Sequence, residues 1–261
     1  MMKRWLTILL VYAGVMISRY GQASLVYEDN FDNDSLGVNA NGVGGGMSSR
    51  TIRGGNHYWD DTGVLQFVTT GNTHFLNRVI AYTDNSFKSS DGFELTVDYF
   101  WTSDGGASSL SFGLVSDDTD LSAYSGLHPF SGDTAVYSFG MNADNGNLAF
   151  SDGTAVTNLD NAAGSLGPAA STSFEVTMNI VPNGSGGANW AWSINSVTQG
   201  VGNVASFDFS KNFHFVAYGQ DDQGNKGINS VSLTAIPEPA TLGLISAFGC
   251  SVLFVRRLFM S

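Results

Sequence analysis

The sequence predicts an all-β protein, a two-sheet antiparallel jelly-roll sandwich with an apolar segment at each end of the chain. Apolar and polar residues alternate with a period of two in residues 93 to 101 (FELTVDYFW) and 174 to 180 (FEVTMNI). Clusters rich in Gly, Asn, Asp and Ser separate such runs, and residues 24 to 236 contain no ten-residue stretch with helical periodicity. Two packed antiparallel sheets bury this pattern most simply.

The expected strands follow one another along the chain at short intervals. Together with the two clearest runs they number about twelve, and the remaining ones cover residues 25 to 28, 64 to 69, 73 to 82, 109 to 115, 134 to 139, 147 to 150, 189 to 195, 206 to 209, 213 to 218 and 228 to 235. Asn145-Gly146 is typical of a type I′ hairpin turn. We expect the first and last strands to pair side by side.

The amino-terminal segment indicates export. Lys3 and Arg4 precede an apolar stretch, and the small residues Gly21 and Ala23 complete a cleavage-site pattern. Residues 1 to 23 are therefore predicted to be a secretory signal peptide, with an uncleaved membrane anchor as the alternative. We expect the sandwich domain to span residues 24 to 236.

The carboxyl-terminal segment, residues 237 to 261, combines three features in order. Pro237-Glu238-Pro239 is followed by an uncharged stretch of fifteen residues from 241 to 255, and then by Arg256 and Arg257. As a helix this stretch would be roughly 23 Å long at 1.5 Å per residue, against about 30 Å for the hydrocarbon core of a bilayer. It is predicted to be a short transmembrane helix whose arginines face the cytoplasm, which places the sandwich outside.

This ending resembles the PEP-CTERM sorting signal. The resemblance implies that an exosortase, a cysteine-dependent enzyme of the cytoplasmic membrane, recognises Pro237, Glu238, Pro239, Arg256 and Arg257 and removes the span. It also implies delivery to the cell surface or to the extracellular polysaccharide of a bacterial biofilm matrix. An ordinary carboxyl-terminal membrane anchor is the alternative.

Charge and cysteine content exclude some functions. The chain has a formal net charge of −12, and only six of its eleven basic residues lie in residues 24 to 239 together with all 23 acidic ones. Nucleic acid should repel so acidic a body, whereas cations should be attracted to it. The single cysteine, Cys250, lies in the apolar span, so we expect no disulfide in the sandwich.

The strand pattern also suggests a fold family. The body opens with LVYEDNFDND, contains about a dozen expected strands and closes with KGINSVSLTAIPEP. In these respects it resembles the concanavalin A-like lectin and glucanase fold, including laminin G-like bacterial domains. The resemblance implies glycan binding without locating a site.

The residues expected for catalysis are incomplete. Glucanases of this fold carry a Glu-x-Asp-x-x-Glu strand, and the nearest match, ELTVDYF, has Glu94 and Asp98 without the second glutamate. No histidine has a serine or cysteine motif beside it in the sequence. We therefore expect a protein that is not an enzyme, with a glycan-cleaving enzyme of the same fold as the alternative.

Acidic loops and aromatic residues supply the candidate binding sites. Calcium is a possible cofactor because aspartates provide hard oxygen ligands, and solvated acidic loops are the alternative; the candidates are Asp117, Asp118, Asp120, Asp221 and Asp222. Trp59 and Tyr124 are candidates for stacking on sugar rings. Trp190 and Trp192 share one strand face with Ile194 and are predicted to lie in the core.

These observations lead to one functional hypothesis. The chain is expected to be an exported, surface-sorted, noncatalytic β-sandwich of the extracellular polysaccharide matrix, with a structural or carbohydrate-binding role. Its expected partners are an exosortase, the membrane before processing, and an extracellular polysaccharide.

Overall fold

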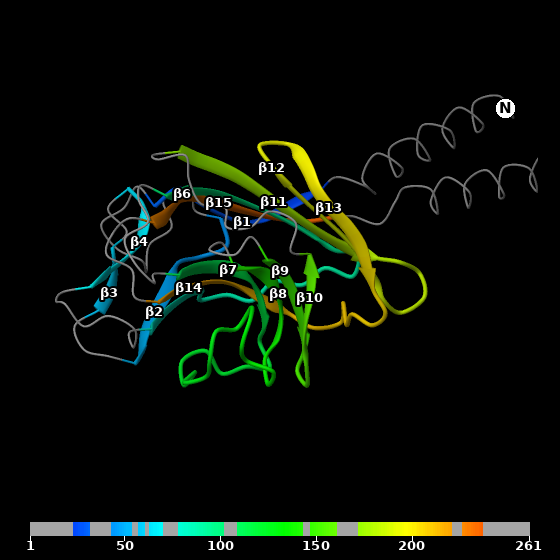
Figure 1. Cartoon of the computed structure of the whole chain (residues 1–261), viewed down its shortest axis with the longest axis horizontal. Coiled ribbons are helices and arrows are strands. Elements are labelled where there is room, and N and C mark those ends of the chain that lie inside the picture. The colour runs from blue at the N-terminus through cyan, green and yellow to red at the C-terminus, as the bar shows by residue number, and fades with distance from the viewer. Residues whose placement is uncertain are drawn as a thin grey trace, which may run out of the picture. The chain divides into compact units, whose positions relative to one another are not determined.

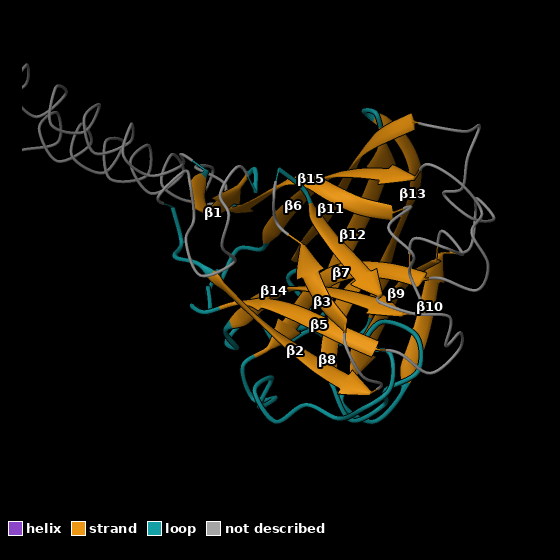
Figure 2. Ribbon diagram, turned by 90° about the vertical axis from the view of Figure 1, so that its left-hand side faces the viewer, coloured by secondary structure: helices purple, strands orange, loops and turns teal. Residues whose placement is uncertain are grey.

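Two antiparallel sheets make up the part of the chain that is described by a computed structural model, namely residues 23–31, 43–53, 57–60, 63–69, 78–101, 109–142, 147–160, 172–220 and 226–236. The described residues contain strands and loops but no helix. Figures 1 and 2 show the sheets facing each other, so the predicted two-sheet all-β sandwich is confirmed.

Sheet A contains eight strands. They are β1 (Ser24–Asp29), β3 (His57–Asp60), β4 (Leu65–Thr69), β6 (Phe93–Trp101), β11 (Thr172–Pro182), β12 (Ala188–Ile194), β13 (Val197–Val204) and β15 (Lys226–Ala235). Their order is β13-β12-β11-β6-β15-β4-β3, and β1 also pairs with β15. The expected pairing of the first strand with the last is confirmed.

Sheet B contains seven strands. They are β2 (Met47–Arg53), β5 (Arg78–Thr83), β7 (Ser109–Ser116), β8 (Tyr137–Asn142), β9 (Asn147–Asp152), β10 (Val156–Asp160) and β14 (Phe213–Gln220). Their order is β10-β9-β8-β7-β14-β5-β2. β8 pairs with β9 as expected, whereas the predicted Asn145-Gly146 turn lies outside the described residues.

The hydrophobic core lies between the sheets and follows from the period-two pattern. In β6, Leu95, Val97 and Tyr99 are buried in this core, whereas Glu94 is exposed on the outer face. Successive side chains of a strand point to opposite faces of the sheet, so an alternating sequence buries one face and leaves the other polar.

Trp190 and Trp192 are buried in the core, as predicted. Opposite them in β13 stand Gly202 and Gly200, which are their direct cross-strand partners. A Cβ atom at Gly202 would lie 2.5 Å from the indole of Trp190, and one at Gly200 would overlap the Asp160 carboxylate and lie 2.9 Å from Nε1 of Trp192. The two glycines therefore leave room for the two indoles and for the carboxylate that is hydrogen-bonded to Trp192.

Several strand predictions need correction. β2, β3, β10 and β13 were not expected, and residues 206 to 209, which were expected to form a strand, form a loop. In that loop Phe207 is buried among aromatic rings, while the Asp208 carboxylate accepts hydrogen bonds from the backbone and hydroxyl of Ser210. The apolar alternation in this loop thus reflects burial within a turn.

The terminal predictions fall outside the described residues, both for the signal peptide and for the sorting signal. Within the described ranges there is no helix of the length and apolar character needed to span a membrane. Leu25–Ala235 forms one compact unit.

Candidate functional site

Residues 117 to 136, which we call the cap segment, join β7 to β8 and cover the outer face of sheet B (Figure 1). Side chains of the cap segment pack there against strand residues that alternate with those of the central core. This second cluster consists of Ile80, Val115 and Val216 from the sheet and Leu121, Tyr124, Phe130 and Val136 from the segment. Burial of these side chains attaches the segment to the sheet.

Two glycines in neighbouring strands create the seat for Phe130. Gly113 of β7 pairs directly with Gly140 of β8. A Cβ atom at Gly113 would lie 2.8 Å from the Phe130 ring, and one at Gly140 would lie 2.5 Å from it. The ring therefore packs on bare backbone, and a larger residue at either glycine would displace it.

His128 anchors the cap segment to β7. Its Nε2 lies 2.5 Å from Ser111 Oγ, and its Nδ1 accepts a hydrogen bond from the Phe130 backbone N–H at 3.1 Å. The imidazole ring also lies against the Tyr218 ring, with 4.6 Å between the centroids. Burial lowers the pKa of His128 from its ordinary value to about 3.

The hydrogen bonds of His128 show which ring nitrogen carries the proton and whether the ring can act as a base. Because Nδ1 accepts from a backbone N–H, the single proton of the neutral ring lies on Nε2, which donates to Ser111 Oγ. A histidine that donates to serine cannot accept the proton of the serine hydroxyl. This serine–histidine contact, which the sequence did not reveal, is therefore structural.

Tyr124 also serves the cap segment. Only 6% of the residue is exposed, and its hydroxyl donates to Asp133 Oδ2 at 2.8 Å and contacts the Leu127 carbonyl. Burial, followed by the hydrogen bond to Asp133, raises the pKa of the Tyr124 phenol. The expected role of Tyr124 in stacking on a sugar needs correction, because stacking requires an accessible ring face.

Asp120 closes a turn within the cap segment. Its Oδ1 accepts hydrogen bonds from the backbone N–H and the hydroxyl of Ser122, at 3.0 and 2.6 Å, and from the Ala123 N–H at 3.2 Å. These bonds, with Ser122 first, lower the pKa of Asp120. The guanidinium of Arg50 donates to the Ser122 carbonyl at 2.6 Å, which ties the turn to β2.

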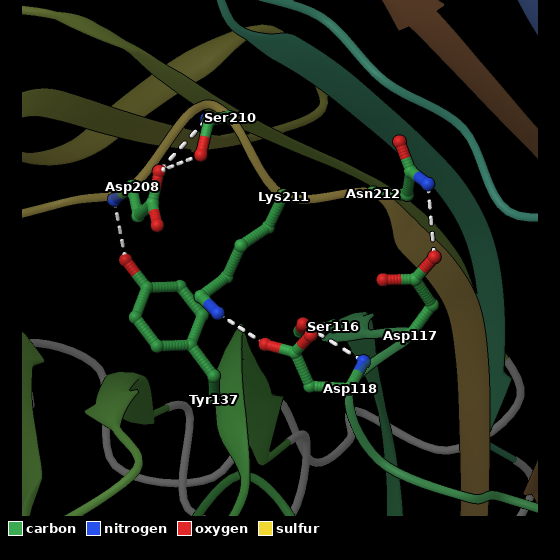
Figure 3. A network of polar contacts seen from close by, with 8 residues as sticks. All are labelled: Ser116, Asp117, Asp118, Tyr137, Asp208, Ser210, Lys211 and Asn212. Carbon is green, nitrogen blue, oxygen red and sulfur yellow. Dashed lines mark hydrogen bonds and ion pairs between the residues drawn. The ribbon is translucent and has the colours of Figure 1, made fainter.

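Asp117 and Asp118 belong to a polar network at the end of β7 (Figure 3). Asp118 forms an ion pair with Lys211, which lowers the pKa of the carboxyl group and raises that of the amine. Asp117 Oδ2 accepts from Asn212 Nδ2 at 2.9 Å. The charge of Asp118 is therefore balanced by a lysine.

The same network extends to β8 through Tyr137. Lys211 Nζ lies 5.2 Å from the centroid of the Tyr137 ring, and the Tyr137 oxygen accepts from the Asp208 N–H at 2.5 Å (Figure 3). Burial raises the pKa of Tyr137 to about 12. The network joins the loop before β14 to the strand ends of β7 and β8.

The expected calcium ligands do not gather into one cation site. In the part of the chain that the structure describes, no group of three or more acidic, histidine or cysteine side chains could hold a metal ion. Asp117, Asp118 and Asp120 instead bond to Asn212, Lys211 and Ser122, respectively. Asp221 and Asp222 lie outside the described residues.

Trp59, the other candidate for stacking on a sugar, lies in β3, where its backbone pairs with Phe67.

Sheet register brings together a carboxylate pair that sequence spacing did not reveal. Asp98 of β6 is the direct cross-strand partner of Glu175 of β11, so their Cβ atoms are about 5 Å apart on the outer face of sheet A. Asn229 Nδ2 donates to Asp98 at 3.2 Å. Glu94 and Asp98, which the sequence suggested, are four positions apart on one strand, or about 13 Å.

Comparison with known proteins gives matches of structure. No protein-family model and no curated protein matches the sequence. The Emp47p carbohydrate recognition domain matches with a TM-score of 0.52 and 11% identity over 81% of this chain and 96% of that one. The metal-free VIP36 exoplasmic/lumenal domain matches with a TM-score of 0.52 and 10% identity, over 84% of this chain and 95% of that one. The metal-free Emp46p carbohydrate recognition domain matches with a TM-score of 0.50 and 11% identity, over 81% of this chain and 97% of that one.

At these identities the matches demonstrate a common fold. The expected lectin-like sandwich of two antiparallel sheets is thereby confirmed for the body of the chain.

Proposed function

We propose that the chain is an exported, surface-sorted, noncatalytic β-sandwich protein that binds or organises extracellular polysaccharide. The observation that carries the proposal is the fold common to this chain and the Emp46p and Emp47p carbohydrate recognition domains. The cap segment supports it, because packing of its buried side chains holds its exposed polar residues in place on the outer face of sheet B.

The noncatalytic part of the proposal rests on two of the three arrangements that resemble active sites. The Ser111–His128 contact is buried, and its hydrogen-bond pattern leaves the ring unable to act as a base toward the serine. Glu94 and Asp98 are about 13 Å apart, whereas the two carboxyl groups of glycosidases are about 5–9.5 Å apart. Neither arrangement meets the needs of hydrolysis.

One observation favours the alternative, a glycan-cleaving enzyme. Asp98 and Glu175 are cross-strand partners with Cβ atoms about 5 Å apart, from which their carboxyl groups can reach the separation of about 5–5.5 Å found in retaining glycosidases. Glu175 is nevertheless exposed to solvent, and the Asp98 carboxylate accepts from an amide. The experiment below therefore includes this pair.

Incubation with the producing organism's own exopolysaccharide tests both functions. We expect the protein to co-sediment with the polysaccharide and to release no reducing ends. Replacing Trp59 with alanine should weaken binding about tenfold by removing a stacking surface, whereas Leu127→Ala, at an exposed apolar residue of the cap segment, should not. Absence of co-sedimentation would contradict carbohydrate binding. Release of reducing ends that stops in Asp98→Asn/Glu175→Gln would establish the enzyme instead.

The same assay tests the role of calcium. VIP36 has also been solved in a Ca2+-bound form with the same fold, with a TM-score of 0.50 to this chain. Asp117, Asp118 and Asp120 do not fit a calcium ion, because the Asn212 amide, the Lys211 amine and the hydrogen bonds of a turn, respectively, already engage them. We therefore expect equal binding in calcium and in chelator. Stronger binding in calcium would point instead to Asp221 and Asp222.

Export and sorting are part of this proposal and have their own test. Replacing Arg256 and Arg257 with aspartate should block delivery to the cell surface, because positive charge keeps the tail on the cytoplasmic side. The double lysine variant preserves that charge and should be delivered normally. Fractionation and amino-terminal sequencing measure the outcome, with Ser24 as the expected first residue. Unchanged delivery of the aspartate variant would contradict a charge-dependent sorting signal.

A further inference from the structure

The β13 edge of sheet A differs in charge from the rest of this acidic protein. No acidic, basic or histidine residue occurs between Glu175 and Asp208, a stretch that contains nearly all of β11 and the whole of β12 and β13. The chain as a whole has a net charge of −12. Three neighbouring strands at one edge of a sheet are thus almost free of charge.

β13 is also an edge strand within the described structure. Among the described strands it pairs only with β12, on one side (Figure 1). An edge strand presents alternate N–H and C=O groups that can pair with another strand. Val197 and Val201, two of its residues, are 63% and 69% exposed, which makes them the most exposed large apolar side chains of the described residues.

Other edge strands carry the charges that usually protect a sheet edge from pairing. β2, at the far edge of sheet B, contains Arg50 and Arg53, and β3, at the far edge of sheet A, contains Asp60. β10 contains Asp160, whose carboxylate accepts from Trp192 Nε1 at 2.6 Å. β13 contains neither charge nor proline, and both are common means of preventing edge pairing.

The outer surface beside this edge is uncharged as well. A shallow depression of about 430 Å³ lies over β11, β12 and β13, and its lining includes Asn179, Val181, Asn189, Val201 and Asn203. Hydrogen-bonding amides and two valines therefore extend the neutral surface inward from the edge. Such a surface has no charge with which to select a partner of opposite charge.

We propose that β13 is an interface at which two copies of this chain pair edge to edge, in antiparallel orientation, to form a continuous sheet. An antiparallel pair of identical strands is related by a two-fold axis, so the same patch is used twice and residues near the axis meet their own counterparts. A charged residue near the axis would repel its counterpart, and two acidic bodies meet the least repulsion where charge is absent. β13 itself carries no charge, and the Asp160 carboxylate that lies against its Gly200 is hydrogen-bonded to Trp192 Nε1.

Sedimentation velocity on the full-length chain, in a mild detergent that solvates its apolar ends, tests the interface. We expect concentration-dependent dimerisation that Val201→Lys weakens at least about tenfold, which corresponds to about 1.4 kcal/mol. Thr198→Lys, at an exposed position of the same strand, should have a similar effect, and it decides the test if Val201→Lys does not fold. Circular dichroism and thermal melting verify the fold of each variant.

Leu127→Lys is the matched control. It adds the same charge at an exposed apolar residue, 52% accessible, in the cap segment on sheet B, so it should dimerise like the unmodified chain. Three results would overturn the proposal: a chain that stays monomeric at high concentration, dimerisation that both β13 variants retain, or equal weakening by Leu127→Lys. If the chain stays monomeric, the β13 edge would instead be available for pairing with a strand of another protein.

Discussion

Replacing Trp192 with alanine is expected to lower the free energy of unfolding by about 3–5 kcal/mol. The residue is only 1% exposed and lies in the central core. Its Nε1 also donates to Asp160 Oδ2 at 2.6 Å, so it links β12 of sheet A to β10 of sheet B. The substitution removes buried apolar area, leaves a cavity between the sheets and breaks this link.

Trp192→Phe separates the two contributions. It retains most of the packing but loses the hydrogen bond, and a bond to a charged acceptor contributes about 1.5–3 kcal/mol. Asp160 is partly exposed and can be solvated, so we expect the smaller end of that range. Urea unfolding monitored by far-ultraviolet circular dichroism measures both variants. If Trp192→Ala lowered the free energy of unfolding by less than about 1 kcal/mol, Trp192 would not stabilise the packing of the two sheets as described.

Acidification from pH 7.5 to pH 5 is expected to cost about 2 kcal/mol of stability through His128 alone. Burial holds the pKa of His128 in the folded chain at about 3, whereas an unfolded histidine has a pKa of about 6.5. Between these two values the unfolded chain binds the extra proton and the folded chain does not. Stability is therefore complete above about pH 6.5 and falls as the pH decreases toward 3.

The groups around His128 explain why the folded ring stays neutral. Ser111 Oγ, the Phe130 N–H and the Tyr218 ring contact it, and the positive charge of Arg78 lowers its pKa further. Protonation would place a proton on Nδ1 opposite the N–H that it now accepts. No carboxylate makes a hydrogen bond to the ring among the described residues, and the backbone hydrogen bond that favours the charged form is outweighed by burial.

His128→Gln should reduce this pH dependence, even if it also lowers stability at neutral pH. His214→Gln is the matched control, because His214 is only partly buried and bonds to the Thr83 carbonyl at 2.6 Å. Urea unfolding at a series of pH values gives the slope for each variant. An unchanged slope in His128→Gln would show that another group is responsible.

Much of sheet A could be predicted because its central strands are buried on one face only, whereas the cap segment also buries the outer face of the central strands of sheet B. β6 and β11 alternate cleanly for this reason, and their alternation is visible in the sequence without knowledge of their neighbours. β2, β10 and β13 lie at sheet edges and bury few apolar side chains, so their sequences carry little periodic signal. The glycines of β13 are typical of a loop in the sequence, and their place in a strand is explained only by the indoles of β12 that lie opposite them.

The candidate sites were less predictable, because their properties depend on partners that are distant in sequence. Asp118 and Tyr124 both occur in an acidic, aromatic loop, which suggested ligands for calcium and sugar. Lys211 is 93 positions from Asp118 and balances its charge, and the packing of the cap segment onto sheet B buries Tyr124. Spacing along a chain does not reveal which charge is already paired or which ring is covered.

The all-β class, the core face of the central strands of sheet A, the acidity of the body and the absence of cysteine from it follow from the amino-acid sequence alone. These properties are local or additive, since they depend on the alternation of neighbouring residues and on sums over composition. In contrast, the contact of Ser111 with His128, the pairing of Asp98 with Glu175 and the position of an uncharged strand at a sheet edge are visible only in the folded chain. Each of these depends on strand order and register, which arise from the packing of the whole chain.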